Sequence, residues 1–207
     1  MVLQVSSKKV TKPFELVAGH PVLDLVNTLD WRFREFGPEE LIPSYEDLVR
    51  FAEQSGVLSP RLARGLRRAE IGNHARVLQE AKDLRETAAQ IFYAMLDEVE
   101  PPVESIVKLN RQLHAALSNR SLRWASSRVK YTWPSGDTDP RLPLWLLAQS
   151  AADLLTSEAA GSVRACANPE CRWLFLDTSK NHLRRWCDMK ICGNRMKVRR
   201  FKAQQRA

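Results

Sequence analysis

Apolar residues recur at intervals of three and four through most of the first 155 positions, the spacing that places them on one face of a helix. The longest run covers residues 74–98 and stops before Pro101 and Pro102, so it predicts a central helix. Shorter runs predict further helices over residues 21–29, from Ser44, from Ser59, and over residues 106–117 and 144–155.

The period changes to two in a few short segments, which predict strands. Residues 122–124 and 129–133 predict one β-hairpin among the helices. Near the carboxyl end, residues 172–176 and 184–186 predict two more strands around a turn, followed by a helix. We therefore expect a mainly α fold, with a helical part over residues 1–159 and a small, treble-clef-like ββα module over residues 160–207. Small and polar residues over 157–162 predict a hinge between them.

All four cysteines fall within this module, as the matched pairs Cys166-x4-Cys171 and Cys187-x4-Cys192. Two short-range pairs of thiolates are the ligand pattern of tetrahedral zinc, and four sulfurs leave no open position for a reactive water. The sequence predicts one structural Zn2+ held by these residues, and residues 160–207 are called the zinc module below. His182, between the pairs, is an alternative ligand in place of one sulfur.

Two disulfides are the competing interpretation of the cysteine pattern, and they require an oxidising compartment. Residues 1–9 contain no apolar segment of a secretion signal. No stretch approaches the roughly 18 apolar residues of a membrane span. We therefore expect reduced thiols, a cytoplasmic protein and no membrane partner.

The positive charge is concentrated in the zinc module. Residues 161–207 contain 12 Lys and Arg against 3 Asp and Glu, whereas residues 1–160 contain 20 against 21. A dense cationic module indicates a polyanionic partner, most often nucleic acid. A solvated charged face without a partner is the alternative.

Basic residues beyond Cys192 follow helical spacing. Arg195, Arg199, Lys202 and Arg206 succeed one another at intervals of four and three, so they form one cationic stripe. We expect Ile191, Val198 and Phe201 to form an apolar stripe that seats this helix on the zinc core, with Gly193 permitting a sharp entry. The residues predicted to contact DNA are Arg184, Arg185, Asn194, Arg195, Lys197, Arg199, Arg200 and Lys202.

Asn194 and Arg195 stand at the start of the predicted helix and are the candidates for base contacts, because Asn pairs with adenine and Arg with guanine in the major groove. Alternatively, Asn194 caps the helix and Arg195 braces the zinc knuckle. The aromatic residues Trp173, Phe175 and Trp186 are expected to form the small core of the module. Stacking on unpaired bases is their alternative role.

The zinc module resembles the CGNR zinc finger family, named after the run Cys192-Gly193-Asn194-Arg195 as it stands here. The resemblance extends to the first cysteine pair, Phe175-x-Asp177, Ser179, residues 184–187 and the basic tail. It implies that the four cysteines bind zinc and that the positive helix contacts DNA. Residues 19–29 are similar to the opening signature of the ABATE domain of stress-induced transcription regulators, which carry a carboxy-terminal CGNR finger.

Three polar residues of that signature are candidates for a small-molecule site. Asp24 and Asn27 share a helix face and His20 lies one turn before Asp24, so the three can orient a ligand or fix a neighbouring helix by hydrogen bonds. Nucleophile-elbow, phosphate-loop, dinucleotide and metalloprotease motifs are absent, and we expect no enzyme activity. A treble-clef nuclease would have only His182 and Asp188 for its histidine and second acid.

These features predict a DNA-binding transcription regulator whose helical part senses a ligand or dimerises. An RNA-binding or protein-interaction zinc module is the alternative. Because one finger has a small footprint, we expect a homodimer, formed through the long apolar helix, to present two fingers. Replacing Cys187 by Ser is expected to unfold the zinc module and leave the helical part standing, since so small a module has little core without its metal.

Overall fold

The structure is a computed structural model, and it describes residues 12–69, 72–133 and 138–205. In chain order the helices and strands are α1 (Pro21–Asn27), β1 (Leu29–Asp30), β2 (Glu39–Glu40), α2 (Tyr45–Gln54), α3 (Pro60–Arg68), α4 (His74–Leu96), α5 (Val103–Ser118), β3 (Ser121–Ala125), β4 (Arg128–Thr132), α6 (Leu142–Leu155), the 3-10 helix η1 (Glu158–Ser162), β5 (Val163–Ala165), β6 (Leu174–Leu176), the π-helical turn η2 (Met189–Gly193) and α7 (Asn194–Gln204).

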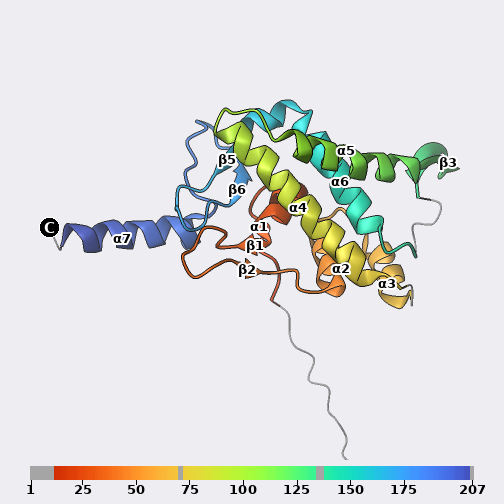
Figure 1. Cartoon of the computed structure of the whole chain (residues 1–207), viewed down its shortest axis with the longest axis horizontal. Helices are drawn as coiled ribbons and strands as arrows, with labels where there is room; N and C mark the ends of the chain where they lie inside the picture. Colours follow the sequence, from red (N-terminus) through yellow and green to blue (C-terminus); the bar gives the residue numbers. More distant parts are fainter. Residues whose placement is uncertain (1–11, 70–71, 134–137, 206–207) are drawn as a thin grey trace, which may run out of the picture.

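α1 lies at the centre of the helical part, and six of its seven residues are buried. α4 and α6 pack against it, and α5 packs on the outer side of α4 and α6. α2 and α3 pack together where α4 begins (Figure 1). The central position of α1 and the burial of α6 follow from their composition, because α1 carries a single charged residue, Asp24, and α6 is apolar around most of its circumference.

The helix starts agree with the capping residues predicted from the sequence. Ser44 Oγ accepts the Asp47 amide at 3.2 Å, and Ser59 Oγ accepts the Leu62 amide at 3.4 Å. α4 is the predicted central helix and ends before the two prolines. Among the described residues, no helix combines the length and the apolar character that crossing a bilayer requires.

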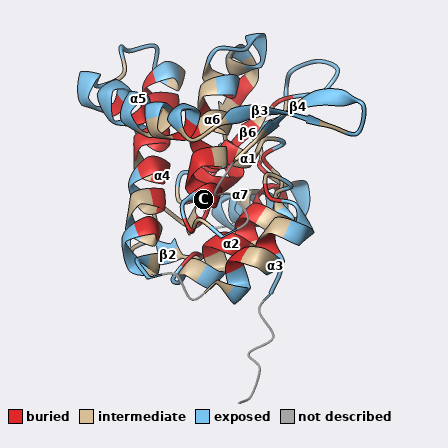
Figure 2. Ribbon diagram, turned by 90° about the vertical axis from the view of Figure 1, so that its right-hand side faces the viewer, coloured by how far each residue is buried: buried red, intermediate tan, exposed pale blue. Residues whose placement is uncertain are grey.

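Within the residues that the structure describes, three two-stranded antiparallel ladders accompany the helices. β3 pairs with β4 as the predicted hairpin, which projects from the helices at the end of the molecule opposite α7 (Figures 1 and 2). β1 and β2 form a short ladder with no clear sequence signal. The mainly α fold with one hairpin and a small ββα zinc module is confirmed.

The second strand expected in the zinc module was wrong. β6 pairs with β5, which precedes the first cysteine, and residues 184–186 are not a strand. The Arg184 amide donates to Asp177 Oδ2 at 3.0 Å, so the Asp177 side chain binds the backbone N–H that a strand pairing would need. The turn after β6 is thereby closed by a carboxylate instead of by a returning strand.

The helical part and the zinc module share one hydrophobic core. The main buried cluster contains Leu23 and Val26 of α1 together with Phe175, Leu174 and all four cysteines. The segment predicted as a hinge forms η1 and leads directly into β5, which contacts α4. Figure 2 shows buried residues on the faces of α1, α4 and α6 that are turned toward the interior. The boundary at residues 159 and 160 stays a prediction, and the packing across it is extensive.

Candidate metal centre and basic helix

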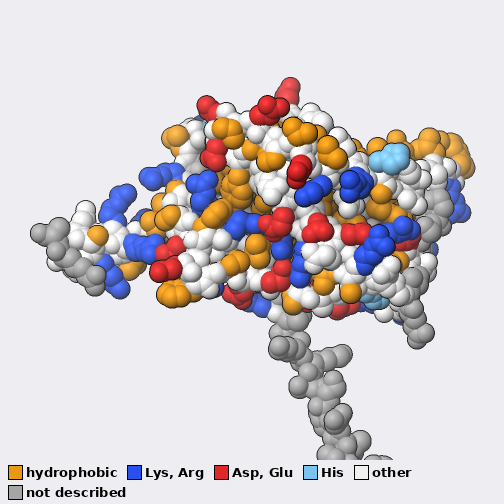
Figure 3. All heavy atoms as spheres, viewed as in Figure 1, with side chains coloured by type: hydrophobic (Ala, Val, Ile, Leu, Met, Phe, Trp, Pro, Cys, Tyr) orange, Lys and Arg blue, Asp and Glu red, His pale blue; other side chains and the backbone are white. Residues whose placement is uncertain are grey.

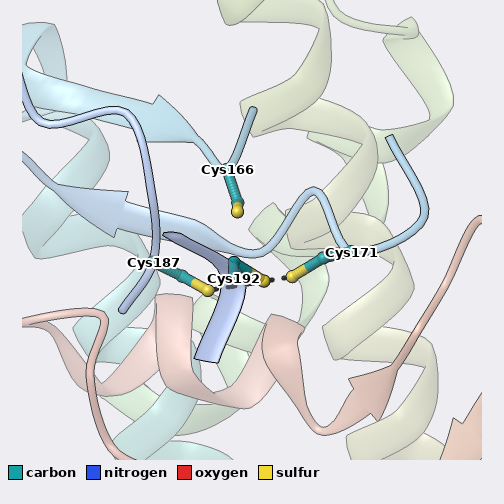
Figure 4. A group of neighbouring side chains, drawn as sticks. All are labelled: Cys166, Cys171, Cys187 and Cys192. Carbon is teal, nitrogen blue, oxygen red and sulfur yellow. Dashed lines mark hydrogen bonds between the residues drawn. The ribbon is translucent and has the colours of Figure 1, made fainter. Parts of the chain in front are cut away.

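The four cysteine sulfurs converge on one point. All four side chains are buried, and their sulfurs lie within 4.8 Å of one another (Figure 4). Sulfurs about 2.3 Å from a single zinc ion stand about 3.8 Å apart in a regular tetrahedron. Cys171 Sγ and Cys187 Sγ are 3.8 Å apart, and the cysteines are free thiols, so the geometry fits a four-coordinate metal and not disulfides. The predicted cofactor, one structural Zn2+, is supported by this geometry.

Backbone hydrogen bonds set each cysteine in place. The Cys166 amide donates to Trp173 O at 2.8 Å, which extends the β5–β6 ladder to the first ligand. The Cys171 amide donates to Asn168 O at 3.0 Å in the turn between the first two ligands. Asp188 begins η2 by accepting the Lys190 and Ile191 amides, and η2 carries Cys192. The two cysteine pairs thus have different local structures.

Asn168 supports the metal site from outside the ligand set. It is buried, its Nδ2 lies 3.6 Å from Cys192 Sγ, and its Oδ1 accepts the Glu170 amide at 3.3 Å. An amide donor next to a thiolate stabilises the charged form and fixes its direction.

Asp177 organises the turn between β6 and Cys187. Its carboxylate accepts the amide and hydroxyl of Ser179 and the amide of Arg184, and these donors hold its pKa below the ordinary value. His182 lies in this turn, exposed, with its Nδ1 3.1 Å from Asp177 O. It is outside the convergent sulfurs, so its alternative role as a zinc ligand has no geometric support.

Gly193 is favoured by the limited space around it and not by its backbone conformation. Its φ of −58° is ordinary for any residue, so the expected sharp entry does not depend on glycine. An added Cβ would stand 2.5 Å from Met189 Sδ and 3.3 Å from Trp186 Cδ1. The glycine therefore lets η2 close over the aromatic residue beside the metal centre.

α7 extends away from the rest of the molecule instead of lying on it (Figure 1). None of its residues is buried, and Val198 and Phe201 are 53% and 59% exposed. The expectation that these two residues seat the helix on the zinc core was wrong, although Ile191 does pack against that core. η2 continues directly into α7, because Gly193 and Asn194 both have right-handed helical backbone angles, and α7 therefore leaves the metal centre without a turn. Arg206 of the predicted stripe lies outside the described residues.

The basic residues predicted to contact DNA differ in how they are held. Arg195 stacks on Trp31 at 4.7 Å, Arg185 lies over Trp186 at 5.3 Å, and Arg199 pairs with Glu170 at 2.5 Å. Asn194, Lys197, Arg200 and Lys202 are exposed and carry no hydrogen bond or ion pair within residues 12–69, 72–133 and 138–205. Figure 3 shows the Lys and Arg side chains around α7.

Arg184 is the exception in that set because its guanidinium is directed into the zinc module. It donates to Trp186 O at 3.0 Å, to Val17 O at 3.2 Å and to Cys187 O, and it stacks on Phe175 at 4.3 Å. A guanidinium held by several carbonyls connects the metal centre to the helical part. This contact gives Arg184 a structural role.

Trp31 joins the surface at the base of α7, although it belongs to the helical part. Its φ of 49° lies in the left-handed region, which is uncommon for a bulky residue, and it turns the chain after β1. The following loop is anchored by Arg85, which is buried and binds both Glu40 oxygens at 2.8 and 2.9 Å. Trp31 and Arg195 line one hollow with Asn194 and Lys202. No sequence pattern predicted this neighbourhood.

The predicted ligand residues lie at the junction with the zinc module. Asn27 Nδ2 donates to Leu174 O at 2.9 Å, and its Oδ1 accepts the Leu174 amide at 2.8 Å. Asp24 Oδ1 accepts the Ala18 amide at 3.0 Å, and Ala18 O accepts the Leu176 amide at 2.8 Å. These contacts complete the outer edge of β6, so both residues have a structural role, and ligand binding by them stays a prediction.

Burial dominates the ionisation of the two titratable members of this group. Burial raises the pKa of Asp24 to about 6, although the amides of Ala18 and Val17 oppose the shift. Burial lowers the pKa of His20, and the negative charge of Asp153 opposes that shift. At neutral pH Asp24 is therefore charged at an energetic cost, and His20 is neutral.

The aromatic residues of the zinc module divide into two kinds. Trp173 and Phe175 are buried, as expected of a small core. Trp186 is half-buried and faces a hollow that it lines with Phe201 and Arg200. Of the three, Trp186 alone is placed where a bound chain could reach its ring.

Comparison with known families agrees with this architecture. A family model named ABATE, described as "Putative stress-induced transcription regulator", matches residues 19–158, more than half of the chain. A second model, the CGNR zinc finger, matches residues 162–205. No curated protein matches the sequence.

Proposed function

Since the chain belongs to the ABATE family and also carries a CGNR zinc finger, we propose that it is a transcription regulator that binds DNA through α7 and acts without catalysing a reaction. The observation that most supports this proposal is α7 itself, an exposed helix attached to a metal centre. It bears five basic residues and no acidic one. A cytoplasmic location and a role in stress response belong to the same proposal.

Phosphate contacts supply most of the binding free energy in this proposal. Lys197, Arg200 and Lys202 have no partner within the described part of α7 and its surroundings, so their charges are available to a polyanion. Zinc keeps the base of the helix rigid, which lowers the entropy lost on binding. Asn194, exposed at the start of α7, is the candidate for base contact, and Arg195 on Trp31 positions the helix beside the helical part.

Fluorescence anisotropy of labelled duplex DNA across a salt series tests this proposal. Affinity should fall steeply with salt, and the double variant Lys197→Ala/Arg200→Ala should lower the slope of log K against log salt by about 1.8, or about 0.9 per phosphate contact. Arg123→Ala/Lys130→Ala on the β3–β4 hairpin removes the same charge from the opposite end of the molecule and should leave the slope unchanged.

Two outcomes of that titration would overturn the proposal. One is an absence of duplex binding even at low salt, which would make α7 a protein-facing or solvated surface. The other is a clear preference for single-stranded RNA of equal length, which would favour the RNA-binding alternative, with Trp186 as the stacking residue.

Ligand sensing is supported by a hollow of about 470 Å³ between α4, α5 and α6. Val77, Leu144 and Trp145 form apolar walls. Two cations of the lining pair with its two carboxylates, Arg76 with Glu80 and Arg141 with Asp139, whereas Arg111 at the edge has no ion-pair partner among the described residues. This chemistry suits a small apolar anion. None of His20, Asp24 and Asn27 lines it.

The probe 8-anilinonaphthalene-1-sulfonate tests the sensing part of the proposal. It should bind the folded protein saturably, and Arg111→Ala should weaken that binding about tenfold because the anion loses its cation. Lys108→Ala, on the same helix and outside this hollow, is the matched control. Equal binding by both variants would remove the support for a site here.

A further inference from the structure

Exposed apolar side chains are concentrated on one surface that the proposed function does not use. Of the sixteen large hydrophobic residues that are substantially exposed in the described part of the chain, ten lie between residues 95 and 131. They are Met95, Val99, Val103, Ile106, Val107, Leu117, Leu122, Trp124, Val129 and Tyr131. Figure 3 shows hydrophobic side chains over α5 and the β3–β4 hairpin. Apolar patches of this extent mark interaction sites.

The outward face of α5 has a pattern that is symmetrical about one residue. Residues 105, 109 and 116 are buried and residue 112 is partly covered, whereas residues 103, 106, 107, 110, 114 and 117 are exposed and form the outer stripe, with the partly covered Leu113 at its edge. Val103 and Leu117 lie seven residues before and after Asn110, and Val107 and Leu113 lie three before and after it. The stripe carries no Asp, Glu, Lys or Arg.

We propose that this stripe and the adjoining hairpin form the interface of a two-fold symmetric homodimer, with α5 packed antiparallel on α5 of a second copy. In that arrangement Asn110 lies on the axis and faces its own copy, where each carboxamide can donate to and accept from the other. Val103 faces Leu117 and Val107 faces Leu113, so these apolar side chains meet across the axis, and Ile106 faces the imidazole of His114. Self-complementarity of this kind is what an isologous interface requires.

The β3–β4 hairpin extends the same surface. Leu122 stands opposite Tyr131 and Trp124 opposite Val129, so the four apolar side chains share one face. All four are more than half exposed, and an isolated two-stranded hairpin is marginally stable in water. The hairpin follows the carboxyl end of α5. When the two α5 helices pair antiparallel, the apolar hairpin face of one copy therefore lies toward the amino end of α5 in the other copy.

The surface is large enough for a stable dimer. If the eight exposed apolar side chains of the stripe and the hairpin expose on the order of 100 Å² each, they supply about 800 Å², which equals one partner's share of a standard interface. α7 lies outside it and stays uncovered. The dimer does not rest on DNA binding, so it is measured without DNA and its failure is distinct from failure of the proposed function.

Sedimentation velocity of the zinc-loaded full chain from about 1 to 100 μM tests the dimer, in the range where interfaces of this size associate. We expect twice the monomer mass. Val107→Glu should weaken the dimer by at least about 100-fold, tenfold from each copy of the substituted residue. Lys108→Glu introduces the same side chain one position along α5 and off the stripe, and it should leave the dimer intact. Far-ultraviolet circular dichroism confirms that both variants fold.

Cross-linking tests the symmetry axis independently of affinity. Asn110→Cys should be joined to its own copy by a short bis-maleimide, because the two residues meet on the axis. Lys108→Cys should not be joined because position 108 lies off the stripe. The unsubstituted protein should not be joined because its four cysteines are buried.

A monomer at all concentrations, or a dimer that Val107→Glu leaves unchanged, would overturn the proposal. So would equal cross-linking at positions 108 and 110. If the stripe instead binds lipid vesicles or a different protein while the chain stays monomeric, the second copy is the wrong occupant.

Discussion

Replacing Asn27 by Ala should uncouple the zinc module from the helical part. The carboxamide of Asn27 makes two hydrogen bonds to the backbone of Leu174, at 2.9 and 2.8 Å, across 147 residues of sequence. Both Leu174 groups point away from β5, so Asn27 takes the place of a neighbouring strand at the outer edge of β6. Alanine supplies neither the donor nor the acceptor.

The magnitude follows from the groups left without a partner. A buried donor or acceptor that loses its partner costs about 1–3 kcal/mol, so the two Leu174 groups together predict a loss of about 2–6 kcal/mol in the free energy of unfolding. That is a large part of the roughly 5–15 kcal/mol that stabilises a typical domain. Asn27→Asp should also destabilise, because it keeps the acceptor but places a carboxylate against the Leu174 carbonyl.

Urea unfolding followed by tryptophan fluorescence measures this loss, and hydrogen exchange locates it at the Leu174 and Leu176 amides. Asn119→Ala is the matched control, since Asn119 makes a single local hydrogen bond to Ala115 O and its loss should cost about 1 kcal/mol or less. If Asn27→Ala unfolds within about 0.5 kcal/mol of the unsubstituted protein, with unchanged exchange at Leu174, these bonds do not hold the two parts together.

Three further predictions follow from the junction and the metal centre. Cys187→Ser should abolish stoichiometric zinc binding and also lower the melting temperature of the helical part, because Cys187 belongs to the shared core. Calorimetry with metal analysis should show one lowered transition. An unchanged transition of the helical part would instead support the expectation from the sequence that this part folds independently of the zinc module. Asp24→Asn should remove one contribution to the pH dependence of stability. The folded pKa of about 6 exceeds the unfolded value of 3.8, so ionisation of Asp24 lowers the free energy of unfolding by about 2–3 kcal/mol as pH rises from about 4 to 7, and urea titrations of the variant should lack this fall. Arg184→Lys should lower the stability of the zinc module while leaving the salt slope of DNA binding unchanged, because it preserves the charge but loses the guanidinium that bridges Val17 O and Trp186 O. A reduced slope with normal stability would instead indicate that Arg184 contacts DNA.

The helices were predictable because their signals are local. Ser44 and Ser59 cap helices that the apolar spacing already indicated, and both caps are made within three residues of the chain. The β3–β4 hairpin was predictable for the same reason, since its two strands are joined by a short turn. The metal centre was predictable from the spacing of the cysteines, because a chelating site restricts ligand spacing tightly.

The strand pairing of the zinc module was not predictable in the same way. Residues 163–165 and 184–186 are both short enough to pair with β6, and the sequence pattern favoured the second. The choice was decided by Asp177, whose carboxylate binds the Arg184 amide, and by Asn27 and Ala18, which cover the outer edge of β6. These contacts leave no periodic signal in the sequence.

The sequence by itself determined the zinc ligands, the helical composition and the concentration of positive charge, because each depends on residue type and near-neighbour spacing. Only the tertiary structure decided that Asn27 pairs with β6, that Trp31 lies under Arg195, and that α7 extends outward with Val198 and Phe201 exposed. These features depend on which distant groups satisfy each other's hydrogen bonds and which surfaces exclude water. Such pairings are settled by the packing of the whole chain, since buried polar groups must find partners wherever the fold brings them.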